Sequence, residues 1–231
     1  MGYYYYGFDM TYLVLVLPAI LIALFAQIKV KSAFSKYSKQ FTKSGLTGKD
    51  AAERILMAGG ITNVKVERVS GNLTDHYDPK TNVIHLSDGV YGSNTISAVG
   101  VAAHEAGHAL QYAEGYAPIK LRAAIIPVTN IGSILTFPLI LLGILFNFTL
   151  LMYLGIAAFG LSTLFQLITL PVELNASKRA MGNLRECSIL GSEELKGAGS
   201  VLSAAAMTYV ASLLVSLMQL LRLLIITQRR R

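Results

Sequence analysis

The sequence predicts an α-helical integral membrane protein with about four transmembrane helices and a small α+β part. Three observations support this prediction. Of the 231 residues, 53% are hydrophobic and only 14% are charged, whereas soluble domains carry about 25% charged residues. Long stretches of the chain contain no charge at all. The polar remainder shows helical periodicity in some segments and the alternation of a strand in others.

Four apolar stretches are long enough to cross a bilayer, which takes about 20 apolar residues. The uncharged run over residues 123–172 is too long for one crossing and suits two helices joined near Phe146-Asn147-Phe148. Prolines inside such stretches are tolerated in transmembrane helices. We therefore expect transmembrane helices at residues 10–28, 123–146, 148–171 and 201–221.

The charges predict how these helices are oriented. Six lysines follow the first crossing before any acidic residue, so the positive-inside rule places residues 29–122 in the cytoplasm. Two further crossings return residues 173–200 to the same side. Four crossings would place Arg229–Arg231 outside the cell, against the positive-inside rule. A last helix that does not cross the membrane therefore remains an alternative. The run Tyr3–Tyr6 suits an interfacial anchor, or else a disordered tail.

The lysines flank a crossing and no nucleic-acid motif accompanies them, so we expect the lipid bilayer as a partner and no nucleic acid. Cys187 is the single cysteine, which excludes an intrachain disulfide and suits a reducing compartment. No internal repeat is visible. We expect one membrane-embedded domain over residues 1–231, with its polar parts at 29–122 and 173–200.

The first polar part combines a helix with strands. Thr47 is expected to cap a short helix, with Asp50 completing a capping box and Gly59-Gly60 ending it. Residues 64–69 alternate as a strand does. Residues 73–77 and 82–86 flank the turn sequence Asp78-Pro79-Lys80-Thr81, which predicts a hairpin. We expect these strands to be antiparallel.

The motif His104-Glu105-Ala-Gly-His108 carries the chemistry. It uses two of only four histidines, four residues apart, so both face one side of a helix. This is the H-E-x-x-H pattern of zinc peptidases, in which the glutamate acts as general base on a water that zinc activates. We expect the helix over residues 95–112, capped by Asn94 or Ser93. A chance match on an ordinary helix is the alternative.

Catalytic zinc takes a third protein ligand. Because two crossings separate Arg122 from Glu173, the chain returns at Glu173 to the side that holds the two histidines. A lone acid at the end of an apolar run must be solvated, paired or metal-bound. Glu173 is therefore a candidate ligand, and an ion pair with Arg179 or Lys178 is the alternative.

The chain resembles the YugP-type bacterial membrane zinc metallopeptidases, from about Asp9 to about Leu224. The resemblance rests on residues 104–111, on Leu73-Thr-Asp-His-Tyr-Asp-Pro79 and on Pro171-Val-Glu-Leu-Asn-Ala-Ser177. It is looser to the heat-shock membrane proteases and the CAAX prenyl proteases.

The resemblance implies a zincin-like catalytic part, one Zn²⁺ per chain and Glu173 as the third ligand. Ser177 stands where those looser relatives have an aspartate, so it would hydrogen-bond a ligand histidine from the second shell, more weakly than a carboxylate.

In similar zincins an edge strand before the metal helix pairs with the substrate backbone. Leu73, Thr74, Asp75 and Tyr77 are our candidates for substrate binding, and His76 or Tyr77 for stabilising the oxyanion. Side chains on an ordinary surface strand are the alternative. We expect His85 to be structural. Arg179 or Arg185 could bind the developing charge, although pairing at a helix end or with phospholipid is favoured.

The expected function is a membrane-embedded zinc endopeptidase of a bacterial plasma membrane, with its site facing the cytoplasm. The polar parts are small for a free-standing protease, so we expect unfolded or membrane proteins as substrates. A zinc-stabilised adaptor or chaperone without proteolytic activity is the main alternative, and Glu105 argues against it because a structural site needs no base. A zinc transporter is disfavoured because residues 123–172 contain no charge or histidine.

Overall fold

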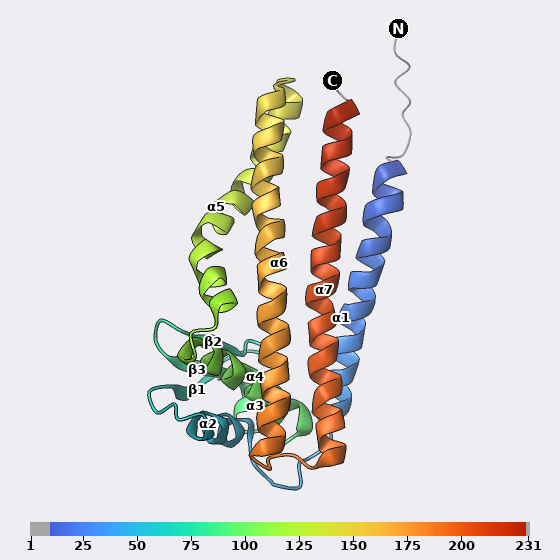
Figure 1. Ribbon diagram of the computed structural model, residues 1–231. Coiled ribbons are helices and arrows are strands. Elements are labelled where there is room, and N and C mark those ends of the chain that lie inside the picture. Colours follow the sequence, from blue (N-terminus) through green and yellow to red (C-terminus); the bar gives the residue numbers. More distant parts are fainter. Residues whose placement is uncertain (1–9, 230–231) are drawn as a thin grey trace.

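The computed structural model describes residues 10–229. Within them, a small α+β part packs beside one end of a bundle of long helices (Figure 1). Tyr3–Tyr6, Arg230 and Arg231 lie outside the described residues. The bundle consists of η1 (Tyr12–Val16), α1 (Leu17–Tyr37), α5 (Ala117–Leu145), α6 (Thr149–Glu186) and α7 (Ser192–Arg229). The small part consists of α2 (Gly48–Ala58), β1 (Lys65–Val69), β2 (His76–Asp78), β3 (Val83–Ser87), α3 (Asp88–Tyr91) and α4 (Ile96–Ala113).

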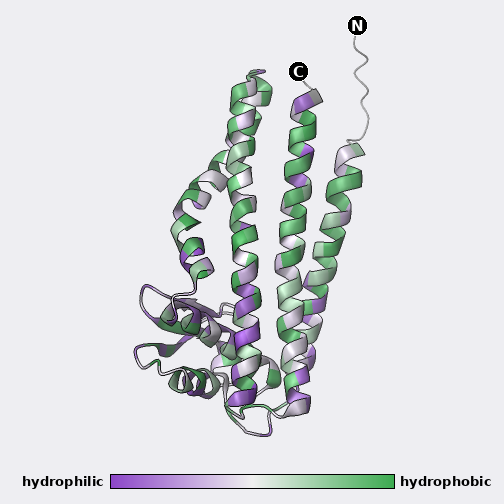
Figure 2. Cartoon of the chain, viewed as in Figure 1, coloured by the Kyte–Doolittle hydropathy of each residue, from purple (hydrophilic) through white to green (hydrophobic). Residues whose placement is uncertain are grey.

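Four helices are long and apolar enough to cross a membrane, which confirms the predicted fold class. They extend beyond the apolar stretches that predicted them. α6 and α7 have 38 residues each, or about 57 Å at 1.5 Å per residue, against about 30 Å of bilayer core. Figure 2 shows hydrophobic residues over the upper bundle and hydrophilic residues gathered toward the small part. Each long helix thus continues from the membrane into the polar part.

The four spans run up and down. The start of η1, the connection between α5 and α6 and the last turns of α7 lie at one end of the bundle, and the small part lies at the other (Figure 1). This arrangement agrees with four crossings, in which the segments before α5 and after α6 share one side.

The sheet has the order β1-β3-β2, so β2 is an edge strand. The predicted hairpin is present, because β2 and β3 pair antiparallel. The expectation that all strands are antiparallel was wrong for β1, which pairs parallel with the central strand β3. β2 also starts at His76 and not at Leu73, because Leu73 has a φ of 56°, a left-handed conformation that no regular strand contains.

The helix ends show where local rules hold. Thr47 caps α2 with the full capping box, since its hydroxyl accepts from the Asp50 amide and Asp50 accepts from the Thr47 amide. The Thr47 hydroxyl also donates to the Asp50 carboxylate at 2.6 Å, and this bond, together with that from the Thr47 amide, holds the pKa of Asp50 below its ordinary value. The predicted caps of α4 were wrong, because Thr95 is the N-cap. The carbonyls of Ser93 and Asn94 instead accept from the amides of Gly48 and Thr42.

α4 packs against α6 through a contact that only glycine allows. A Cβ atom built on Gly107 would lie 2.7 Å from the carbonyl oxygen of Ala176 on α6. Ala106 and Ala109 on α4 and Ala180 on α6 are also buried. A glycine in the middle of this helix is therefore needed for close approach of α6.

We predict that Gly107→Ala destabilises the protein by about 1–3 kcal/mol, since the added methyl group must push α4 and α6 apart. Gly160→Ala is the matched control, because Gly160 is also inside a helix and has open space around its Cβ position. The control should be neutral or slightly stabilising, because alanine favours helix by about 1 kcal/mol. Thermal unfolding in detergent measures both, and equal unfolding temperatures would contradict the close contact.

Candidate metal centre

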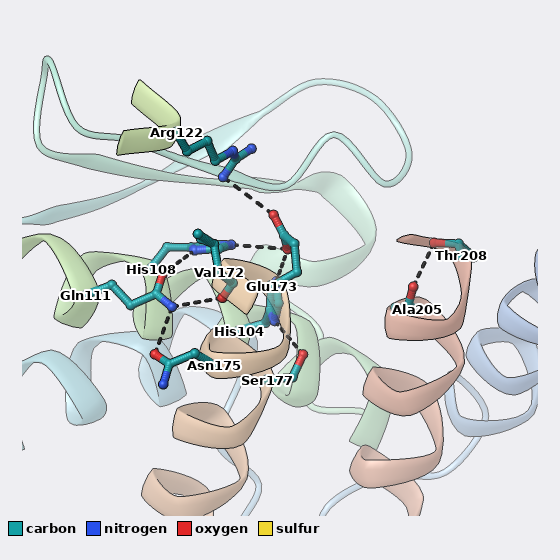
Figure 3. A network of polar contacts seen from close by, with 10 residues as sticks. All are labelled: His104, His108, Gln111, Arg122, Val172, Glu173, Asn175, Ser177, Ala205 and Thr208. Carbon is teal, nitrogen blue, oxygen red and sulfur yellow. Dashed lines mark hydrogen bonds and ion pairs between the residues drawn. The ribbon is translucent and has the colours of Figure 1, made fainter. Parts of the chain in front are cut away.

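α4 and α6 bring three candidate ligands together. His104 and His108 lie one turn apart on α4, and Glu173 reaches them from α6 (Figure 3). Glu173 Oε2 is 3.2 Å from His104 Nε2 and 3.5 Å from His108 Nε2. Among the described residues, these three side chains form a group whose ligand atoms all lie within 4.8 Å of one another.

A chain of hydrogen bonds sets the tautomer of His108. The Arg179 Nε can only donate, so it fixes Asn175 Oδ1 as an acceptor at 2.7 Å. Gln111 Nε2 then donates to that same oxygen at 2.9 Å and to the Val172 carbonyl at 2.8 Å. Gln111 Oε1 is left to accept from His108 Nδ1 at 3.0 Å. In neutral His108, therefore, Nε2 directs a lone pair at the Glu173 carboxylate.

A lone pair that faces a carboxylate is unfavourable unless a proton or a metal ion lies between them. Glu173 is only 3% exposed and His108 only 8%, so water does not screen the two groups. Burial, the largest effect, lowers the pKa of His108. Hydrogen bonds with Glu173 and Gln111 and the charges of Glu105 and Glu173 outweigh it, and the pKa is raised. The position between these groups thus attracts positive charge, as a metal site does.

The donor set fits zinc. Two imidazole nitrogens and one carboxylate form the three-ligand set of catalytic zinc sites, which leave a fourth position open. His104 Nδ1 lies 3.2 Å from Ser177 Oγ, and His108 is held by Gln111. Metal-binding histidines have such partners on the ring nitrogen that does not bind the metal. Ser177 therefore lies within hydrogen-bonding distance of His104, the kind of contact that the family resemblance implied for it.

A cavity of about 260 Å³ opens beside the three ligands. Glu105, 8% exposed, lines it next to His104. Arg122 on α5 lies across the cavity and makes an ion pair with Glu173 Oε1 at 3.4 Å. Tyr209 on α7 also lines it and interacts with both Glu173 and Glu105. The site therefore combines groups from four helices.

Sequence reasoning missed three of these residues. Gln111 had a usable signal, because it follows His108 by three residues and lies on the same helical face. Arg122 was recognised only as the last charge before a crossing, and its direction depends on how α5 packs. Tyr209 lies inside an apolar stretch about 100 residues from the motif, where nothing local distinguishes it.

Three residues of the predicted edge strand line the cavity: Asp75, His76 and Tyr77. His76 stacks on His85 of β3, with ring centroids 4.8 Å apart. The Tyr77 hydroxyl donates to Asn82 Oδ1 at 3.0 Å, and Tyr77 also lines the cavity.

The remaining predicted residues have other surroundings. The Asp75 carboxylate accepts from the amide of Ser87 at 2.7 Å and from its hydroxyl, so it ties β3 to the segment before β2. Thr74 is exposed, and its hydroxyl donates to the Ser70 carbonyl at 3.3 Å. Leu73 lines a neighbouring cavity, described below. Arg179 pairs with Glu114 at 2.6 Å, so it is not the partner of Glu173.

Comparison with known proteins agrees with this geometry. Residues 12–228 match the family described as "Putative neutral zinc metallopeptidase". The chain is similar to the "Putative membrane protease YugP" of Bacillus subtilis (strain 168), at 48% identity over 217 residues, which cover 94% of this chain and 96% of that protein. No solved structure matches the chain. Zn²⁺ is the metal that the family implies.

We predict that His104→Ala, His108→Ala and Glu173→Ala each lower the zinc content of the purified protein well below one ion per chain, because each removes one of three ligands. His85→Ala is the control, since His85 lies on β3 and contacts His76 but not the three ligands. Elemental analysis after dialysis measures the content. A Glu173→Ala protein with full zinc would remove Glu173 from the ligand set.

Proposed function

We propose a function that starts from the family of this chain, because the chain belongs to the neutral zinc metallopeptidase family. In this proposal it is a membrane-embedded endopeptidase with its site at the cytoplasmic membrane surface. The observation that carries the proposal is the cluster of His104, His108 and Glu173 beside Glu105 in one cavity. A site that only stabilises the fold would use four protein ligands and would need no base beside them.

His104, His108 and Glu173 would hold Zn²⁺, which would supply Lewis acidity for activating water and polarising the scissile carbonyl. Glu105 is our general base. It follows His104 directly in α4, lines the cavity and is nearly buried. We propose that its carboxylate takes a proton from the attacking water and then delivers it to the leaving amine.

Three side chains around the cavity are candidates for stabilising charge on the substrate. His76, the sequence-based candidate, lines the cavity with Nδ1 2.8 Å from the Thr74 carbonyl, which leaves Nε2 to face the substrate. Tyr209 and Arg122 line the same cavity from α7 and α5. The Arg122 guanidinium pairs with Glu173 Oε1 at 3.4 Å, so its positive charge lies beside the proposed metal ligands.

The substrate backbone is proposed to pair with the segment from Leu73 to Tyr77. β2 is an edge strand of the sheet, so one row of its backbone groups is available for an added strand. In this proposal Thr74 and Asp75 contribute backbone groups, because their side chains bond to Ser70 and Ser87. Tyr77 lines the cavity beside the candidate metal ligands, and Leu73 lines the neighbouring cavity.

The position of the site supports unfolded or membrane proteins as substrates. Glu173 lies just past the apolar part of α6, and Arg122 lies just before the apolar part of α5. The metal ligands are therefore near the level where the bilayer ends. We propose that residues 1–231 act as one membrane-embedded unit in a bacterial plasma membrane, in which 29–122 and 173–200 face the cytoplasm.

We predict that Glu105→Gln retains zinc but loses cleavage of an unfolded protein by at least about a hundredfold, the scale of general base catalysis. Wild type and variant are compared after their zinc contents are matched, with a chelator as a further control. Loss of zinc from the variant would contradict the role of Glu105 as a base. Equal inactivity of both zinc-loaded proteins would favour a zinc-stabilised adaptor.

We predict that the small part faces the cytoplasm. In a Cys187→Ser background, Met57→Cys places a thiol on α2, where Met57 is 77% exposed. Phe146→Cys places one between α5 and α6, at the other end of the bundle, where Phe146 is 69% exposed. A membrane-impermeant thiol reagent should label only the second in intact cells and both after lysis. The reverse pattern would invert the orientation.

A further inference from the structure

A second cavity, of about 320 Å³, adjoins the metal centre along a different flank. Its walls come from α1 and α7, whereas those of the metal-centre cavity come largely from α5 and the β2 region. The two cavities share Asp75, His104, Glu105 and Tyr209. The residues between them thus include the candidate ligand His104 and the proposed base Glu105.

The walls of the second cavity are largely apolar. α1 contributes Val30 and Phe34, four residues apart and therefore on one face of the helix. α7 contributes one face as well, with Leu202, Ala205 and Ala206. The short side chains of the two alanines leave the space that larger residues on α7 would fill.

Leu73 lines the same cavity from the loop before β2. Its φ of 56° is a conformation that leucine rarely adopts, and its side chain is 60% exposed. An apolar side chain in such a conformation is retained where the surrounding structure or a function requires it. Here it adds an apolar wall between the proposed substrate-pairing segment and the cavity.

We propose that this cavity binds a large apolar side chain of the substrate, from one of the two residues that flank the scissile bond, and that Ala205 and Ala206 set the size it accepts. The inference rests on the proposed function and deepens it. A peptide whose scissile carbonyl lies at Glu105 is at the junction of both cavities. Successive side chains of an extended peptide point to opposite sides, so one of them enters the apolar cavity.

The volume agrees with this occupant, since cavities that bind small ligands start at about 300 Å³. The charged residues that line it are Lys31 of α1 and the shared residues Asp75 and Glu105, and the rest of the lining is largely apolar. A large apolar side chain gains free energy by leaving water for such walls, whereas alanine buries much less apolar surface. The pocket therefore favours leucine-sized or larger apolar residues over alanine.

The test is the preference of the enzyme, measured with peptides that differ only at the two positions flanking the cleaved bond. The ratio of kcat/KM for leucine over alanine at the pocket-binding position should be at least about tenfold in the wild type. Ala205→Phe fills the cavity and should reduce this ratio to near one. Ser203→Phe is the control, because Ser203 is an exposed residue of α7 that does not line the cavity, and it should keep the wild-type ratio.

A second variant makes the test independent of whether Ala205→Phe folds. Phe34→Ala enlarges the cavity, so its ratio of kcat/KM for phenylalanine over leucine should rise above that of the wild type. Zinc content and thermal unfolding verify that each variant is folded. Unchanged ratios in the folded variants, as expected if a lipid chain occupies the cavity, would overturn the pocket and leave the peptidase intact. Absence of cleavage by zinc-loaded wild type would instead overturn the proposed function, and the pocket with it.

Discussion

The buried carboxylate of Glu173 is the constraint on which the rest of the site depends. A carboxylate at 3% exposure must be compensated by hydrogen bonds or positive charge, since burial removes its hydration. Here its oxygens face two imidazoles and one guanidinium. Because neutral His108 turns a lone pair toward this carboxylate, a proton or a metal ion among the three side chains completes the compensation. The proposed metal binding and the packing of α4 on α6 are therefore coupled.

The close contact of the two helices makes this geometry possible. Gly107 lies between the two histidines on α4, and it is the residue that lets the backbone of α6 approach at Ala176. Ser177 follows Ala176 and reaches His104, while Gln111 is held by Val172 and Asn175 and reaches His108. One helix–helix contact thus positions the candidate ligand Glu173 and the residues that hydrogen-bond the two histidines, so none of them depends on a loop.

The length of the helices explains how a membrane protein can carry a polar site. α6 and α7 extend past the apolar part of the bundle, so that α6 provides both a candidate membrane span and a candidate metal ligand. Arg122 and Tyr209 enter the site from two other candidate spans, α5 and α7. The site consequently lies near the end of the apolar part of the bundle, and the apolar second cavity between α1 and α7 lies beside it. This placement suits substrates that present apolar residues near a membrane.

Local patterns were sufficient for much of this description. The apolar stretches, the capping box at Thr47, the hairpin of β2 and β3 and the spacing of His104 and His108 each depend on residues within a few turns of one another. Glu173 could be predicted as a candidate ligand because two crossings of the membrane return the chain to the side that it left. The parallel pairing of β1, the helix that approaches Gly107 and the positions of Arg122 and Tyr209 could not be predicted in this way. They depend on how strands pair and helices pack laterally. These arrangements are set by contacts between residues far apart in the chain, which produce no period or spacing in the sequence.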